Sequence, residues 1–143
     1  MPTVRKSVIV PHPATAMYAL VADFERYPEF LPWCREARVL ERHAHEVKGM
    51  LVIDFRGFTS EIATRNRMVA GRSITLELLD GPFERFHGLW TFEALGDEGS
   101  RVALDVEYSF SAGVVQALMA PVFGHITGTL VERFVARADE VAP

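Results

Sequence analysis

Hydrophobic and polar residues alternate through the central part of the chain, from Cys34 to Phe110. The last of these stretches shows the pattern clearly, since Val102, Leu104 and Val106 would share one face of a strand while polar neighbours share the other. A period of two is typical of an antiparallel sheet with one face in water. Turn residues divide the region into separate strands. The predicted strands are residues 36–42, 46–56, 59–69, 73–79, 85–94 and 101–110.

The N-terminal region begins with one more predicted strand, residues 4–10. Apolar residues then recur at helical spacing, as in Met17, Val21 and Phe24, and Pro13 suits the first turn of a helix because an amide N–H is not needed there. Prolines at 28 and 32 would interrupt a long helix. We therefore expect a second short helix, capped by Asp23 and ending near Leu31.

Helical spacing returns after residue 112, where apolar residues recur three or four apart up to Ala138. Pro121 predicts a kink or a restart, with a short helix before it and a longer one after. The 24 residues between Glu107 and Glu132 contain no charged side chain, which is long enough for a membrane span. Interspersed Ser, Thr, Gln, His and Gly residues argue against a span, so we expect a helix largely buried by its own protein or by a ligand.

This order of elements predicts an α+β domain over residues 1–143, in which an antiparallel sheet of about seven strands wraps around a long C-terminal helix. Seven strands at about 4.8 Å spacing span roughly 30 Å, whereas one helix is only about 10–12 Å wide. One helix cannot cover such a sheet, so the sheet must curl and the two short helices must close part of the gap. The space that remains is either a filled core or an elongated apolar tunnel.

Composition and charge narrow the classes of function. Hydrophobic residues make up 49% and charged residues 24%, as in ordinary folded proteins, and a single thiol, Cys34, excludes an intrachain disulfide and a cysteine-built zinc site. No apolar stretch follows the first charges, so we expect no secretory signal and a cytoplasmic protein. The net charge is −4, with +3 in residues 1–72 and −7 in residues 73–143, which argues against general nucleic-acid binding. Several basic residues, Arg56 among them, fall in the central segment and leave a local basic patch open. Solvated charges along the rim of the strands are the simpler interpretation.

Three motifs resemble one known family. They are Leu20–Asp23 with Glu25–Cys34, Leu79–Phe83 with Gly88, Trp90 and Phe92, and Pro121–Phe123 with Leu130, Val131, Phe134, Arg137 and Ala138. In this order they are similar to the coenzyme Q-binding and ribosome-association-toxin branch of the START-like superfamily, also labelled polyketide cyclase or lipid transport. The resemblance covers nearly the whole chain and departs in Ala120, where the family usually has glycine. It implies a helix-grip fold with a cavity for a hydrophobic ligand, and favours ubiquinone or another isoprenoid lipid.

Candidate site residues follow from this fold. Taken singly, each apolar candidate is also typical of ordinary core packing. The expected cavity lining is Leu51, Ile53, Phe55, Ile62, Trp90, Phe92, Val106, Tyr108, Phe123 and Ile126. A short segment between two prolines carries Tyr27, Phe30, Leu31 and Trp33, which either form a lid at the cavity mouth or a rigid corner that plugs one end.

Three functions remain open. The first is a non-catalytic carrier or chaperone for a hydrophobic molecule, with no required cofactor, which would contact the inner membrane transiently. The second is a regulator that binds the large ribosomal subunit and blocks subunit joining, with RNA contacts from Arg35, Arg38, Arg65 and Arg67. The third is a polyketide cyclase, for which Glu61, Arg65 and Asn66 would have to face inward. No metal site is predicted, and the oligomeric state is left open.

Overall fold

The computed structural model describes residues 3–55, 58–111 and 113–141. Every predicted strand is present within two residues of its expected ends, and Arg56, the predicted last residue of one strand, lies outside the described residues. The elements in chain order are β1 (Thr3–Val10), α1 (Ala14–Ala22), the 3₁₀ helix η1 (Phe24–Glu29), β2 (Cys34–Arg42), β3 (Glu46–Phe55), β4 (Phe58–Val69), β5 (Ser73–Asp80), β6 (Phe83–Leu95), β7 (Gly99–Phe110) and α2 (Gly113–Val141).

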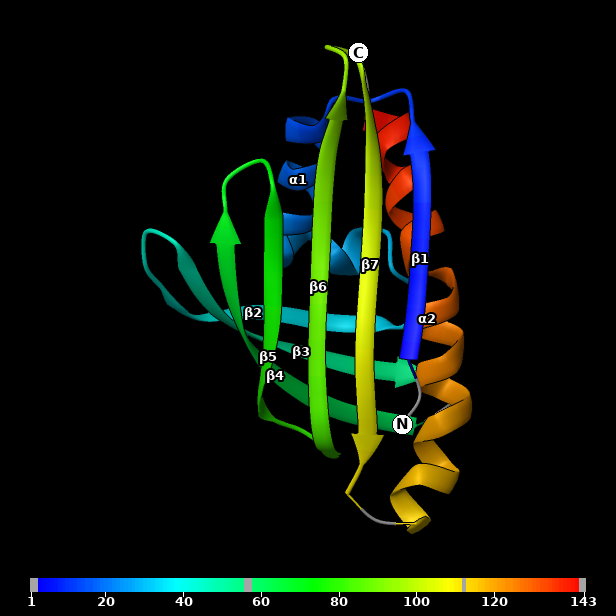
Figure 1. Cartoon of the computed structure of the whole chain (residues 1–143). Helices are drawn as coiled ribbons and strands as arrows, with labels where there is room; N and C mark the ends of the chain where they lie inside the picture. Colours follow the sequence, from blue (N-terminus) through cyan, green and yellow to red (C-terminus); the bar gives the residue numbers. More distant parts are fainter. Residues whose placement is uncertain (1–2, 56–57, 112, 142–143) are drawn as a thin grey trace.

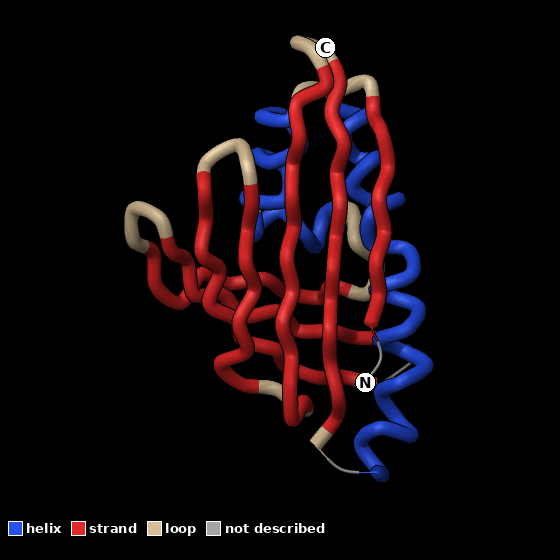
Figure 2. Tube along the Cα trace, in the orientation of Figure 1, coloured by secondary structure: helices blue, strands red, loops and turns tan. Residues whose placement is uncertain are grey.

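All seven strands form one antiparallel sheet in the order β1-β7-β6-β5-β4-β3-β2. The sheet is strongly curved: β1, β6 and β7 run nearly upright in Figure 1, whereas β2, β3 and β4 cross behind them. The helices gather on the concave side, with α2 running along the β1 edge (Figure 2). This is the α+β helix-grip architecture that the sequence predicts, and the predicted fold class is confirmed.

Strand β7 shows why the sheet has a buried face. Val102, Leu104, Val106, Tyr108 and Phe110 alternate with more exposed residues, and each of the five is less than 9% exposed. Burial of one such side chain contributes about 1.5–3 kcal/mol. The period of two in the sequence therefore selects the face of β7 that packs against the helices.

The N-terminal helices follow the prediction in position but not in detail. Pro13 occupies the N-cap of α1, one residue before the first helical position. Asp23 separates α1 from η1 as expected, yet its side chain caps neither helix, so the predicted capping role is wrong. Its carboxylate instead lies 3.0 Å from Nε of Arg26 in an exposed ion pair. The turn from one helix to the next leaves the carboxylate closer to this guanidinium than to the free amides of η1.

Helix α2 continues without a break through Pro121, and the predicted restart there is wrong. Proline removes the amide that would bond to the carbonyl of Ala117, and both residues lie on the exposed face, where water can replace that partner. The buried face is formed by Met119, Val122 and Phe123, whereas Leu118 is 55% exposed. The charge-free segment is therefore only half buried. None of the helices in the described ranges is long and apolar enough to cross a membrane.

Candidate functional site

A cavity of about 100 Å³ lies between the concave face of the sheet and helix α2. Residues of β3 to β7 form one wall, residues of α2 form another, and residues of α1 and η1 complete the lining. The sequence predicts that one helix is too narrow to cover the sheet. Side chains fill part of the space that this leaves, and the rest is the cavity. Seven of the ten expected lining residues line this cavity: Leu51, Ile53, Ile62, Trp90, Val106, Phe123 and Ile126.

The other three, Phe55, Phe92 and Tyr108, lie outside the cavity lining. The ring of Phe55 packs against the imidazole of His125, with 5.0 Å between the ring centroids. Phe92 packs 5.7 Å from the ring of Tyr18 on α1. Tyr108 belongs to an aromatic cluster at the other end of the sheet. These side chains share the inward face that strand periodicity predicts, but the strands are longer than the cavity, so the ends of that face pack against other elements.

Phe134 of α2 is a lining residue that the sequence analysis does not single out as a candidate. It is 1% exposed and contacts three aromatic rings, with centroid distances of 5.3 Å to Tyr27, 5.2 Å to Phe30 and 5.3 Å to Trp90. Its spacing of four residues from Leu130, another lining residue, is the helical signal that marks this face of α2. Phe134 thus joins α2 to both η1 and the sheet.

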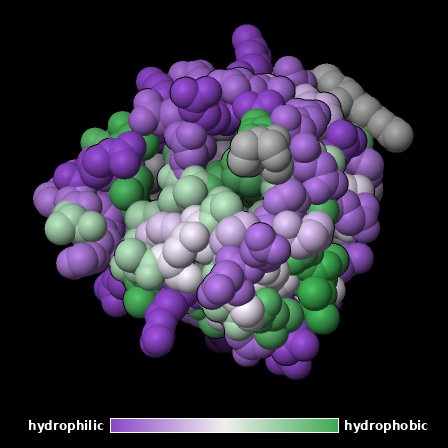
Figure 3. All heavy atoms as spheres, turned by 90° about the horizontal axis from the view of Figure 1, so that it is seen from above, coloured by the Kyte–Doolittle hydropathy of each residue, from purple (hydrophilic) through white to green (hydrophobic). Residues whose placement is uncertain are grey.

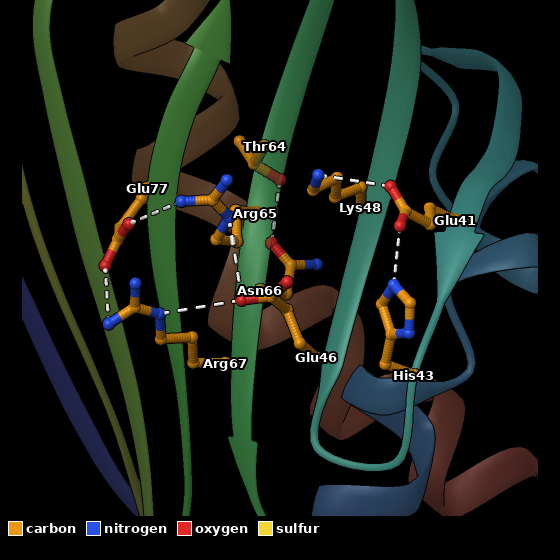
Figure 4. A network of polar contacts seen from close by, with 9 residues as sticks. All are labelled: Glu41, His43, Glu46, Lys48, Thr64, Arg65, Asn66, Arg67 and Glu77. Atoms are coloured by element: carbon orange, nitrogen blue, oxygen red, sulfur yellow. Dashed lines mark hydrogen bonds and ion pairs between the residues drawn. The ribbon is translucent and has the colours of Figure 1, made fainter.

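Polar atoms of the lining come mainly from β4, α2 and the residue just before β2. On β4, Thr64 and Asn66 face the cavity, and the Thr64 hydroxyl donates a hydrogen bond of 2.7 Å to Oδ1 of Asn66 (Figure 4). The hydroxyl of Thr127 donates back to the Phe123 carbonyl of its own helix at 2.9 Å. The indole Nε1 of Trp33, the residue just before β2, is buried and has no hydrogen-bond partner among the described residues.

The segment from Tyr27 to Trp33 forms a packed corner at the cavity. Tyr27 and Trp33 line the cavity, Leu31 is 1% exposed in the core beside it, and Phe30 is half-buried. The Tyr27 hydroxyl donates a hydrogen bond of 2.5 Å to the carbonyl of Val21. Burial raises the pKa of Tyr27 well above its ordinary value, so the phenol stays neutral. Whether this corner also opens as a lid stays a prediction.

The described residues that line the cavity include no pair of groups for acid–base chemistry. Tyr27 is the only titratable side chain among the described residues that line it, and its raised pKa opposes ionisation. Two of the residues that a cyclase would need, Glu61 and Arg65, lie on the outward face of β4, because Ile62, Thr64 and Asn66 occupy the inward one. Within the described ranges, no three His, Cys, Asp or Glu side chains come close enough to hold a metal ion. The geometry therefore suits binding better than proton transfer.

The predicted RNA-contact arginines lie on the outer surface, and most are held by carboxylates. Arg65 and Arg67 both lie between Glu46 and Glu77, with N···O distances of 3.5 to 3.9 Å (Figure 4). Strand pairing places these opposite charges across from one another on β3, β4 and β5.

The remaining two arginines lie on the edge strand β2. Arg38 is 2.8 Å from the Glu36 carboxylate, while the exposed Arg35 forms no ion pair within the part of the chain that the structure describes. The positive patch is therefore largely neutralised by its own neighbours. Seen from the end uppermost in Figure 1, hydrophobic residues reach the surface in the middle of the view and in smaller groups near its edges, between hydrophilic residues (Figure 3).

Comparisons with known proteins agree with this geometry. Residues 10–135 match the family described as polyketide cyclase / dehydrase and lipid transport. A Pseudomonas aeruginosa protein named ribosome association toxin RatA is 36% identical over 138 residues, which cover 96% of each chain. The mitochondrial coenzyme Q-binding protein coq10 of Schizosaccharomyces pombe is 22% identical over 94% of this chain and 85% of that one. A crystal structure of an aromatase/cyclase from a Streptomyces species has a TM-score of 0.88 at 17% identity, covering 99% of this chain and 96% of that one, which shows a shared fold.

Proposed function

The chain belongs to the polyketide cyclase/dehydrase and lipid transport family, and we propose that it is a non-enzymatic protein that binds a hydrophobic small molecule in the cavity beneath α2. The family resemblance of the three sequence motifs is confirmed by this match. The observation that carries the proposal is the character of the cavity, which has an apolar wall and no acid–base pair. Such a wall favours ligands by burying their apolar surface.

Ubiquinone or a related isoprenoid lipid is the ligand we favour. The name of the coq10 relative points to coenzyme Q, and apolar burial supplies the affinity. Each buried CH₂ contributes about 0.8 kcal/mol, so one five-carbon isoprene unit contributes on the order of 4 kcal/mol. An engineered cavity of about 150 Å³ accepts a benzene ring, and the present volume of about 100 Å³ is smaller, so even one substituted ring requires the cavity walls to move apart. A longer tail requires α2 or η1 to move outward, and its release would take place in transient contact with the inner membrane from the cytoplasm.

The test is to purify the full chain from its native host, extract bound lipids and identify them by mass spectrometry. We expect a quinone or another isoprenoid in stoichiometric amount. A variant with the cavity filled, Val106→Phe, should lose this ligand while Val102→Phe retains it, because Val102 lies on the same face of β7 outside the lining. Recovery of no lipid from the native protein, or of equal amounts from both variants, would contradict the proposal.

Ribosome association is a second candidate function. A specific observation favours it: relatives named ribosome association toxin share 36% and 32% identity with this chain over nearly its full length. Such a role would use the surface of the protein, with the large subunit as the partner and Arg35 as the predicted contact that carries no ion pair among the described residues.

Co-sedimentation with purified ribosomal subunits at 50 and 200 mM salt tests this candidate. Binding that weakens steeply with salt and with Arg35→Glu, but that is unchanged by Val106→Phe, would support a surface role. Absence of co-sedimentation at the lower salt concentration would exclude it. Arg101→Glu is the matched control, because Arg101, which pairs with Glu93, is not one of the predicted contacts.

A further inference from the structure

We infer that Trp33 and Asn66 select the ligand, by donating hydrogen bonds to oxygen acceptors such as the carbonyls of an otherwise apolar ring. This inference rests on the proposed function, since it concerns the same cavity, and it specifies which apolar molecules the cavity prefers. A plain hydrocarbon would fill the space but leave both donors unpaired. A molecule with carbonyl oxygens would fill the space and satisfy them.

Trp33 supplies the first donor. The residue is 4% exposed and lines the cavity, and its Nε1–H has no acceptor among the described residues. The backbone around it is fixed, since the carbonyl of Trp33 accepts a hydrogen bond of 2.8 Å from the amide of Asp54. Most buried donors in folded proteins have a partner, because leaving one unpaired is costly. An acceptor on a bound molecule would give this indole N–H the partner that the described residues do not supply.

Asn66 supplies the second donor. It is 7% exposed on the inward face of β4, between lining residues of β3 and β5. The Thr64 hydroxyl donates to its Oδ1, which fixes the amide and leaves Nδ2 without an acceptor in the described parts of the chain. Valine or leucine would make this part of the wall apolar, whereas the amide keeps a donor available at the cavity. An oriented amide is therefore a second sign that the ligand has polar atoms.

The two donors lie at different ends of the cavity. Trp33 precedes Cys34, which pairs with Ile53 of β3, whereas Asn66 pairs with Val47 at the opposite end of that strand. The two positions are six residue steps apart along β3, or roughly 20 Å of strand. One small ring therefore contacts one donor at a time. A longer ligand would place separate oxygen atoms at the two ends.

Two probes of nearly equal shape test the inference: duroquinone (tetramethyl-1,4-benzoquinone) and durene (1,2,4,5-tetramethylbenzene). They carry the same four methyl groups and differ in two carbonyl oxygens. The full chain, labelled with ¹⁵N, is titrated with each probe, and the two indole N–H signals of Trp33 and Trp90 are followed by NMR. We expect duroquinone to bind at least tenfold more tightly than durene and to move the Trp33 indole proton downfield, while that of Trp90 moves much less.

Trp33→Phe assigns the signal. Because one ring contacts one donor at a time, Trp33→Phe and Asn66→Leu should each remove only part of the preference for duroquinone, and the double variant should abolish it. Equal affinity for both probes, or an unmoved Trp33 signal at saturating duroquinone in the unmodified protein, would overturn the inference and leave the proposed apolar binding intact. Binding of neither probe would overturn both. The wild-type titration decides the matter even if a variant fails to fold.

Discussion

The ring of Phe24 lies directly against the backbone of Gly49. A Cβ atom at position 49 would lie 2.7 Å from Cε1 and 2.9 Å from Cζ of this ring, closer than carbon atoms normally approach. Phe24 is buried at the start of η1, and Gly49 is buried in the middle of β3. Because Gly49 has no side chain, η1 can pack against β3 beside the cavity.

Gly49→Ala should destabilise the protein by about 1–3 kcal/mol, because Phe24 must leave its place for the added methyl group. The free energy of unfolding from urea denaturation measures this change. Gly124→Ala is the matched control: Gly124 lies on the exposed face of α2 with nothing within 4 Å of a Cβ, so alanine should stabilise by about 0.5–1 kcal/mol. Equal effects of the two substitutions would show that crowding by Phe24 is not the cause.

Val106→Phe should block ligand binding by filling the cavity, at a cost of about 1–3 kcal/mol in unfolding free energy. The affinity for durene, measured by NMR titration, should fall at least tenfold. Val102→Phe should cost as much stability or more, since Val102 is fully buried, but should leave a folded protein with its affinity for durene. A loss of affinity in both variants would point to general loosening of the fold.

Arg137→Gln should speed ligand release, because Arg137 joins α2 to η1. Its guanidinium lies 2.7 Å from the Glu29 carboxylate and 5.1 Å from the centre of the Phe30 ring. We expect a loss of about 0.5–1.5 kcal/mol in stability and a several-fold higher dissociation rate of bound duroquinone, measured by NMR exchange. Arg101→Gln, which removes an exposed pair with Glu93 on the sheet, should change neither quantity appreciably. An unchanged dissociation rate in Arg137→Gln would show that η1 does not control access.

Tyr27→Phe should cost about 1–3 kcal/mol, because it leaves the buried carbonyl of Val21 without its hydrogen bond. Urea denaturation at pH 7 measures the loss. Tyr18→Phe is the control, since Tyr18 is half-buried and its hydroxyl makes no hydrogen bond with described residues. It should change stability by less than about 0.5 kcal/mol. A similar small effect at Tyr27 would mean that water replaces the lost partner.

Stability should fall in mildly alkaline solution because of Cys34. Burial raises the pKa of its thiol to about 11, from an ordinary value of 9.0, while a backbone hydrogen bond with Glu36 opposes this slightly. The unfolded chain therefore loses this proton first, so the contribution is complete below pH 9 and is lost as the pH rises through 11. Unfolding free energies at pH 8 and 9.5 should differ more for the native chain than for Cys34→Ala. Identical differences would contradict the buried-thiol explanation.

The sequence predicts the strands well because burial of one face of a strand appears directly as an alternation of apolar and polar residues. The alternation in β7 specifies which side of Leu104 and Val106 faces inward, and both line the cavity. The width of the sheet relative to one helix also predicts that space remains. What the pattern cannot give is where along a strand the cavity ends, which is why Phe92 shares a face with Trp90 and yet packs beyond the lining against α1.

The sequence predicts the orientation of polar residues less well than that of apolar ones. Arg65 and Asn66 are neighbours, and only strand register decides that the amide faces the cavity and the guanidinium faces solvent. Pro121 shows a second limit, since its effect on a helix depends on whether water reaches the carbonyl one turn earlier. Both outcomes depend on tertiary packing, which a single sequence expresses only weakly.

The pairing of β1 with β7 has a consequence for how the protein is made. Thr3 lies opposite Glu107, and Val10 lies opposite Ser100, so about ninety to one hundred residues must be synthesised before the first strand meets its only partner in the sheet. Such distant contacts slow folding, because the chain entropy of closing the loop is lost before the contacts form. Strand β1 is thus synthesised long before it can pair, and a nascent chain stalled before residue 99 should remain protease-sensitive in β1.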